Sequence, residues 1–124
     1  MYNRKIKLAF VDDSLFQQML INRLVGKITV FDLLFVCKNG LELLHKLACS
    51  PVLPEICIID LHMPYMDGNE VAKEIAERFP SIRLFGYTAS QDLNEINSFR
   101  RSGVVKVFAK SNPIAMLNDI SFYA

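Results

Sequence analysis

Short and almost purely apolar runs recur along this chain at intervals of roughly 20–25 residues, and amphipathic stretches separate them. The run Ile56-Cys57-Ile58-Ile59 contains no charged residue, as is typical of a strand that is covered on both faces. Strands of this kind belong to parallel sheets, because crossover helices cover both sides of such a sheet. The alternation therefore predicts an α/β fold around one parallel sheet.

Turn and cap signals divide the chain into five strands and five helices. Asn39-Gly40 separates two periodic segments, and Pro80 ends another. Ser14 and Asn69 are predicted to cap helices at their amino-terminal ends. The predicted strands cover residues 5–11, 31–37, 55–61, 82–87 and 104–109, and the predicted helices cover residues 14–26, 41–48, 70–79, 92–102 and 113–122.

The predicted helices differ in their apolar anchors. The helix over residues 92–102, which Gly103 is expected to end, has Leu93, Ile96 and Phe99 as its only strong anchors. We therefore expect this helix to be the most mobile one. In the helix over residues 14–26, the apolar residues that lie at helical spacing are Leu15, Phe16, Met19, Leu20, Leu24 and Val25.

The size and charge of the chain limit its function. Its 124 residues suffice for one domain with a single core. The 14 Lys and Arg nearly balance 13 Asp and Glu, so nothing in the charge favours direct binding of nucleic acid or an anionic membrane. Without a signal-peptide pattern or an apolar stretch of ~18–20 residues, a cytoplasmic location is expected. The cysteines expected to be buried and reduced are Cys37, Cys49 and Cys57.

Polar residues follow four of the predicted strands at the point where each strand ends. Asp12-Asp13 follows the first strand, Asp60 ends the third, and Lys110 follows the fifth. The carboxyl ends of parallel strands meet at one edge of a sheet, so we expect these side chains to converge. Thr88, at the end of the fourth strand, adds a hydroxyl at the same edge.

Such a cluster suits the transfer of a phosphoryl group to a carboxylate. Both reactants are negatively charged, so a divalent cation must offset their repulsion and a fixed cation must balance the charge on the product. Mg²⁺ prefers oxygen ligands and usually keeps several waters, so a few carboxylates suffice to bind it. Each acid taken alone is explained by a turn or a helix cap. Their joint occurrence at the strand ends favours the phosphoryl-accepting site.

The segment D-L-H-M-P-Y-M-D-G from Asp60 to Gly68, together with Asp12-Asp13, Thr88-Ala89 and Lys110, resembles the receiver domain of two-component response regulators. The resemblance covers essentially the whole chain. It implies a flavodoxin-like, doubly wound sheet of five parallel strands in the order 2-1-3-4-5, with five helices. Residues 1–124 would then form one receiver domain, either free-standing or excised from a longer regulator.

The resemblance also implies a role for each site residue. Asp60 would accept the phosphoryl group from a histidine kinase or a phosphotransfer protein. Asp13, Asp60 and the backbone carbonyl of His62 would bind Mg²⁺ directly, and Asp12 would act largely through water. The chain would assist its own phosphorylation and dephosphorylation without being an enzyme in the ordinary sense. The residues that would contact phosphoryl oxygens are Thr88 and Lys110.

The resemblance further implies an output surface, formed by the fourth helix, the fifth strand and the fifth helix. An effector domain or output protein would bind there, and a phosphorylation-dependent dimer is a further expectation. Arg100, Arg101 and Lys106 are candidates for exposed contacts on this surface, and solvated surface charge explains them equally well. Direct contact of this domain with nucleic acid or membrane is not expected.

Three departures from the family pattern matter, at Val107, at Ser111 and at the pair His62 and Ser90. The residue three before the lysine is usually aromatic and moves together with the threonine. Here it is Val107, while the neighbouring Phe108 should point to the opposite face of the sheet. We therefore expect residues 88–90 and the fourth helix to carry the switch. Ser111 stands where the family usually has a proline, often cis; we expect a trans bond there and a last helix that begins at Pro113.

Other interpretations remain open at this stage. His62 and Ser90 lie where side chains can order the hydrolytic water, and His62 either does so or is a plain exposed loop residue. A phosphohydrolase with an aspartyl-phosphate intermediate would need a second acid at position 62 and a cap domain. A receiver-like interaction module that acts without phosphorylation is favoured only by Val107. A nucleotide site lacks its glycine-rich motif.

Overall fold

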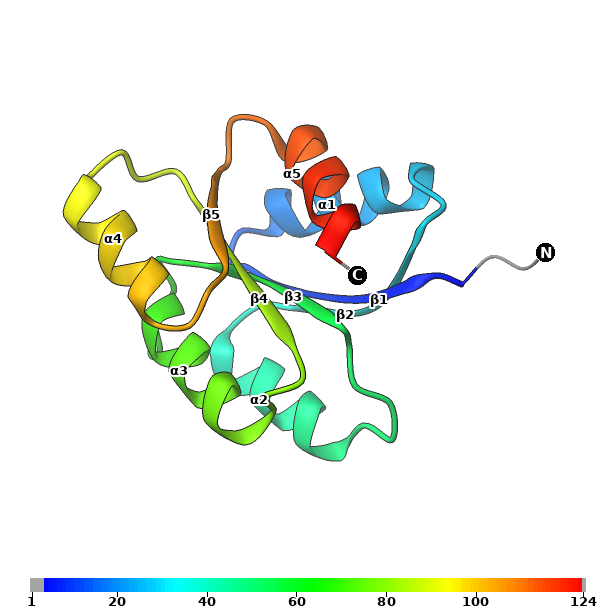
Figure 1. The fold of residues 1–124 in the computed structure, drawn as a ribbon, viewed down its shortest axis with the longest axis horizontal. Helices are drawn as coiled ribbons and strands as arrows, with labels where there is room; N and C mark the ends of the chain where they lie inside the picture. The colour runs from blue at the N-terminus through cyan, green and yellow to red at the C-terminus, as the bar shows by residue number, and fades with distance from the viewer. Residues whose placement is uncertain (1–3, 124) are drawn as a thin grey trace.

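The computed structural model describes residues 4–123 and contains the predicted parallel sheet (Figure 1). All neighbouring strands pair in parallel, and their order is β2-β1-β3-β4-β5, as predicted. Of the expected domain over residues 1–124, residues 1–3 and 124 lie outside the described part. The strands are β1 (Ile6–Val11), β2 (Phe31–Cys37), β3 (Ile56–Asp60), β4 (Arg83–Thr88) and β5 (Lys106–Ala109).

Five helices cover the sheet: α1 (Leu15–Lys27), α2 (Gly40–Cys49), α3 (Gly68–Arg78), α4 (Leu93–Arg101) and α5 (Pro113–Ile120), and a 3₁₀ turn follows at Ser121–Tyr123. Helices α1 and α5 lie on one face of the sheet, and α2 and α3 lie on the other (Figure 1). Each face has its own apolar cluster, centred on Phe10 and Ile21 under α1 and α5, and on Ile59 and Ile75 under α2 and α3. The fold is therefore doubly wound, with five strands and five helices as predicted.

The helix caps differ in part from those predicted. Ser14 caps α1, where its side chain accepts a hydrogen bond from the backbone N–H of Gln17, as predicted. The prediction that Asn69 caps the third helix is wrong. Asp67 is the cap, and it forms a reciprocal capping box with Glu70, so α3 begins two residues earlier than predicted. A carboxylate followed by glutamate three residues later satisfies two backbone donors, which Asn69 cannot do.

The apolar residues at helical spacing in α1 are not all buried. Leu15, Phe16 and Met19 are exposed, at 68%, 68% and 63% of their surface, whereas Ile21 and Val25 are buried. The helix carries two apolar stripes, and helical periodicity alone cannot rank them. Packing against the sheet and α5 decides between the stripes, and it leaves the first one in contact with solvent.

Helix α4 is held by fewer apolar contacts than predicted. Only Phe99 is buried, Ile96 is half-buried, and Leu93 is 72% exposed, so Leu93 is no anchor. Phe99 packs against Gly86 of β4, where a Cβ atom would meet the Phe99 ring at 2.6 Å. The helix ends at Arg101 with Ser102 as its C-cap, and Gly103 follows with a φ of 121°. One aromatic side chain therefore joins α4 to the core.

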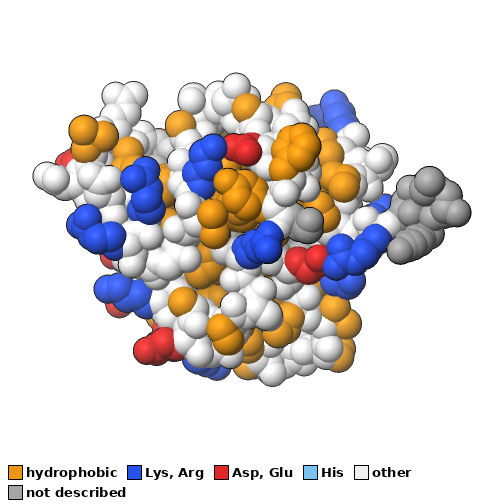
Figure 2. All heavy atoms as spheres, in the orientation of Figure 1, with side chains coloured by type: hydrophobic (Ala, Val, Ile, Leu, Met, Phe, Trp, Pro, Cys, Tyr) orange, Lys and Arg blue, Asp and Glu red, His pale blue; other side chains and the backbone are white. Residues whose placement is uncertain are grey.

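The expected output surface carries both apolar and basic side chains. Figure 2 shows hydrophobic surface across the middle of one face of the molecule, with lysine and arginine side chains towards α4. Arg100 and Arg101 are exposed at the end of α4, which fits both contact residues and plain solvated charges. Lys106 is also exposed, and its Nζ lies 2.7 Å from Asp119 Oδ2 of α5. This ion pair joins β5 to α5 at the surface.

Two further predictions concern cysteines and membrane spans. Cys37 and Cys57 are buried, and burial raises the pKa of the Cys37 thiol to about 12. Cys49 is exposed at the last residue of α2, so the prediction that it is buried is wrong. Within residues 4–123, no helix has the length and apolar character needed to cross a bilayer.

Candidate functional site

Three carboxylates gather where β1 and β3 end. Asp12 and Asp13 follow β1, and Asp60 is the last residue of β3; one oxygen from each lies within 4.8 Å of the others. The register explains this convergence, because Val11 pairs with Ile59, so the residues that follow each of them come side by side. Asp12 and Asp60 are buried, whereas Asp13 is exposed. The predicted acidic cluster is therefore present at the predicted edge.

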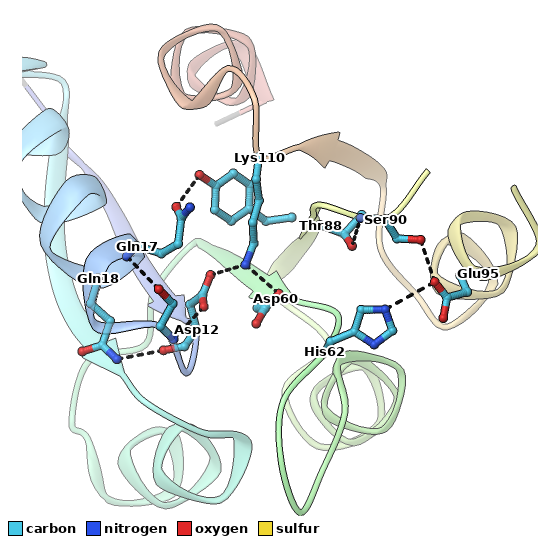
Figure 3. A network of polar contacts seen from close by, with 11 residues as sticks. Asp12, Gln17, Gln18, Asp60, His62, Thr88, Ser90, Glu95 and Lys110 are labelled. Carbon is cyan, nitrogen blue, oxygen red and sulfur yellow. Dashed lines mark hydrogen bonds and ion pairs between the residues drawn. The ribbon is translucent and has the colours of Figure 1, made fainter. Parts of the chain in front are cut away.

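Lys110 reaches this cluster from the end of β5 (Figure 3). Its Nζ lies 2.8 Å from Asp12 Oδ2 and 3.0 Å from Asp60 Oδ1. From the described residues, 4–123, no hydrogen bond of good geometry reaches the buried Asp12 Oδ2, so its contact with Lys110 is an ion pair rather than an aligned hydrogen bond. The backbone N–H of Lys110 donates to the Thr88 carbonyl at 3.0 Å, which holds the lysine beside β4.

The charges of the site are not balanced by its own residues, since three carboxylates face one ammonium group. Burial, and next the neighbouring Asp12, raise the pKa of Asp60 from 3.8 to about 7, although Lys110 works against this rise. Burial tends to lower the pKa of Lys110, but the carboxylates of Asp12 and Asp60 outweigh it and raise that pKa. An all-oxygen donor set with excess negative charge fits a hard divalent cation.

The turn after β3 depends on one glycine. The backbone N–H of Gly68 donates to the Leu61 carbonyl at 2.7 Å. A Cβ atom at Gly68 would lie 2.5 Å from the Asp60 carbonyl oxygen, so no other residue fits unless the end of β3 moves. The predicted motif from Asp60 to Gly68 is therefore a tight loop in which the last residue packs against the backbone of the first.

Helix α1 is tied to the cluster through Asp12. Asp12 Oδ1 accepts a hydrogen bond from the backbone N–H of Ser14 at 2.9 Å, and the Asp12 carbonyl accepts one from the side-chain amide of Gln18 at 2.9 Å (Figure 3). These bonds fix both the carboxylate and the first turn of α1. Gln18 could not be identified from its sequence position, because glutamine is common at exposed helix positions.

Thr88 lies at the same edge, buried at the end of β4. Its Oγ1 accepts a hydrogen bond from the backbone N–H of Ser90 at 3.0 Å. Among residues 4–123, no hydrogen bond joins the Thr88 hydroxyl to Asp60 or Lys110. The structure thus places Thr88 beside the cluster, with its hydroxyl engaged by its own loop.

Glu95 is a residue that the sequence analysis missed. Its Oε1 accepts a hydrogen bond from the Ser90 hydroxyl at 2.6 Å and lies 3.3 Å from His62 Nε2 (Figure 3). The loops after β3 and β4 thereby meet at one carboxylate in the first turn of α4. A glutamate in a first helical turn is common, so its position in the sequence does not distinguish this role.

The departures at Val107 and Ser111 lie as predicted. Val107 is half-buried and packs on the α2 and α3 side of the sheet, whereas Phe108 lies on the opposite side, 6.0 Å from the Phe85 ring. No peptide bond within residues 4–123 is cis, so the bond before Ser111 is trans. Pro113 is the first residue of α5. The aromatic neighbour, Phe108, therefore lies on the wrong side of the sheet to replace an aromatic residue at position 107.

Comparison with known proteins agrees with this architecture. The sequence profile of the response regulator receiver domain matches residues 8–120. The chain is 35% identical to the chemotaxis protein CheY of Listeria monocytogenes over 79 residues, which are 64% of each protein, so the match spans less than two thirds of that relative. It is 25% identical to the CheY of Thermotoga maritima, over 93% of this chain and 97% of that one.

Solved structures show the same fold. The signal receiver domain of the response regulator NarL from Mycobacterium tuberculosis superimposes with a TM-score of 0.86 at 17% identity, over 98% of this chain and 99% of that one. A CheY-like receiver domain protein from Methanospirillum hungatei superimposes with a TM-score of 0.83, at 17% identity, over 96% of this chain and 93% of that one. At these identities the likeness establishes the fold alone.

Proposed function

Because this chain belongs to the response regulator receiver domain family, we propose that it accepts a phosphoryl group on Asp60 in a Mg²⁺-dependent reaction. The convergence of Asp12, Asp13 and Asp60 within 4.8 Å, with Lys110 Nζ 3.0 Å from Asp60, is the observation that carries this proposal. The donor is a histidine kinase or a phosphotransfer protein. The chain is an acceptor that assists its own phosphorylation and dephosphorylation.

The transfer exchanges one bond to phosphorus for another. An Asp60 oxygen bonds to phosphorus while the bond from phosphorus to the donor's imidazole nitrogen breaks. That nitrogen keeps the electron pair, and the imidazole, protonated on its other nitrogen, leaves neutral. Lys110, already beside Asp60, pairs with the transferred group, and Thr88 donates to one of its oxygens after leaving Ser90.

The residues proposed to hold Mg²⁺ are Asp13, Asp60 and the backbone carbonyl of His62, with Asp12 acting through water. When bound there, Mg²⁺ would offset the repulsion between the carboxylates and the incoming phosphoryl oxygens and would favour the ionised form of Asp60, which the reaction needs as nucleophile. This matters because the pKa of Asp60, about 7 in the absence of a cation, leaves part of the acceptor protonated at neutral pH.

A mass measurement tests the acceptor role. With Mg²⁺ and acetyl phosphate, the parent protein should gain the mass of one phosphoryl group. Asp60→Asn should gain none, and chelation of the metal should abolish the gain in the parent. Asp32→Asn, which removes an exposed carboxylate on β2, is the matched control and should behave as the parent does. A parent without the gain, or a gain that survives in Asp60→Asn, refutes the proposal.

We also propose that residues 88–90 and α4 carry the signal to the face formed by α4, β5 and α5, where an effector domain or output protein binds. The support is the Glu95 carboxylate, which joins Ser90 and His62 to a helix with one buried anchor, Phe99. When Thr88 turns towards the phosphoryl group, the Ser90 backbone loses its partner and the loop is free to shift.

Hydrogen exchange with and without beryllofluoride, a phosphoryl mimic, tests this route. Exchange at the amides of residues 88–101 should change, whereas exchange in α2 should not. Identical exchange at residues 88–101 in the two states would eliminate this route while leaving the acceptor chemistry intact. Gel filtration of the same samples tests the phosphorylation-dependent dimer.

A further inference from the structure

Tyr87 is a buried aromatic residue at the site that the proposed chemistry does not use. It is fully buried on β4, directly before Thr88, and it pairs in register with Asp60 of β3. Its ring meets the Phe10 ring edge to face, with centroids 5.8 Å apart. This packing on the α1 side leaves the ring little freedom to turn.

The hydroxyl of Tyr87 is satisfied from α1. It donates a hydrogen bond to Gln17 Oε1 at 2.8 Å, across 70 positions of sequence. Burial, and then the carboxylates of Asp12 and Asp60, raise the pKa of Tyr87 to about 12, so the phenol stays neutral at physiological pH. The ring is therefore fixed at its polar tip by Gln17 as well as along its side by Phe10.

The ring face of Tyr87 lies against Lys110. Tyr87 pairs in register with Phe108 of β5, and Lys110 directly follows the end of that strand, two positions beyond Phe108. Lys110 Nζ lies 5.4 Å from the ring centroid, within the range of a cation–π contact. The ammonium group thus has the two carboxylates of Asp12 and Asp60 on one side and an aromatic face on another.

We propose that Tyr87 is a positioning residue, whose ring holds the Lys110 ammonium at the acceptor carboxylates. Lysine has a long flexible stem that loses much rotamer freedom when it is fixed at a site. A rigid aromatic wall removes the alternative positions before the phosphoryl group arrives, which favours the transfer. This inference rests on the proposed acceptor role of Asp60, and the test separates the two.

The first test compares rates of phosphorylation by acetyl phosphate. Tyr87→Phe keeps the ring and should stay within about twofold of the parent. Tyr87→Leu and Tyr87→Met remove the ring and should be slower by about tenfold, the fold-change expected for one desolvated cation–π contact. Phe108→Leu is the matched control, because the Phe108 ring faces Lys106 at 5.1 Å rather than Lys110, and it should leave the rate unchanged. Equal rates in the parent and both ring-less variants overturn the inference.

A second test separates positioning from simple packing. Placing phenylalanines with increasing ring fluorination at position 87 weakens the negative face of the ring at nearly constant shape. The rate should fall stepwise along this series if the ring acts on the ammonium. In a Lys110→Ala background the effects of ring removal and fluorination should disappear. A flat series, or an undiminished effect in Lys110→Ala, shows that Tyr87 acts by packing alone.

The two proposals fail in different ways. If the parent gains phosphoryl mass but Tyr87→Leu and Tyr87→Met match its rate, only the role of Tyr87 is refuted. If the parent gains no mass, the acceptor role is refuted. The contact between the Tyr87 ring and Lys110 is then still tested by urea unfolding of the parent, Tyr87→Met, Lys110→Ala and the double variant. The two substitutions should then be non-additive, and additive effects overturn the contact as well.

Discussion

The carboxylate cluster of Asp12, Asp13 and Asp60 and helix α4 are neighbours in the molecule, but they are held in different ways. Asp12 and Asp60 are buried and joined by Lys110, and the motif after β3 closes onto itself at Gly68. Helix α4 has one buried residue, Phe99, and otherwise touches the site through surface contacts of Glu95. A fixed cluster suits chemistry that needs preset geometry, and a loosely anchored helix suits a switch with two states of similar free energy.

Removal of the Phe99 side chain, the single anchor of α4, should have the largest effect on stability. Phe99→Ala should lower the free energy of unfolding by about 3–5 kcal/mol, because it empties a fully buried aromatic site. Hydrogen exchange should show the amides of α4 opening before those of β3. Ile96→Ala, on the same helix but half-buried, is the control and should have a smaller effect. Equal protection of α4 and β3 in the Phe99 variant would contradict the idea of a separately opening helix.

The pH dependence of stability should test the carboxylate cluster, the other region of this comparison. The pKa of Asp60 rises from 3.8 to about 7 on folding. Between these two pH values, the Asp60 carboxyl is largely ionised in the unfolded chain but still protonated in the folded one. In metal-free buffer, the free energy of unfolding should therefore fall as pH increases from about 4 to about 7, by at most about 4 kcal/mol. Asp60→Asn should flatten this slope. Urea unfolding across this range measures it, and an equal slope in Asp60→Asn would show that another group causes it.

The close approach of Gly86 to Phe99 should have an intermediate effect. Gly86→Ala places a Cβ atom where the Phe99 ring lies 2.6 Å away, so overpacking should cost about 1–3 kcal/mol. A smaller side chain in Phe99→Leu should remove most of that cost in the double variant. Urea unfolding of the four proteins gives the coupling. Additive effects would mean that the backbone, and not the ring, absorbs the clash.

The surface contacts of Glu95 should have the smallest effect on stability. Glu95→Gln should raise exchange at the α4 amides by the equivalent of about 0.2–1 kcal/mol, since exposed pairs of this kind contribute little. Glu74→Gln, which weakens the surface pair with Arg78 on α3, is the matched control and should leave α4 unchanged. If both variants leave α4 exchange as it was, Glu95 does not tie the helix to the site.

The sequence predicted the site better than it predicted the surroundings. Asp12, Asp13, Asp60 and Lys110 could be placed together because strand alternation and a parallel sheet force the strand ends to one edge. The face of α1 could not be predicted, because its two apolar stripes are equivalent in periodicity. Glu95 was missed since its partners, His62 and Ser90, lie 33 and 5 positions away in sequence. Contacts of this kind leave no local pattern.

The sequence by itself determined the doubly wound sheet, its strand order through the family resemblance, and the acids and lysine at its edge. Local hydrophobic patterns and residue chemistry suffice for these features, because they depend on periodicity and on strand ends. Only the tertiary structure decided which stripe of α1 is buried, that Phe99 alone anchors α4, and that Tyr87 lies between Gln17 and Lys110. These features depend on how distant elements meet, and the packing of the whole chain sets that.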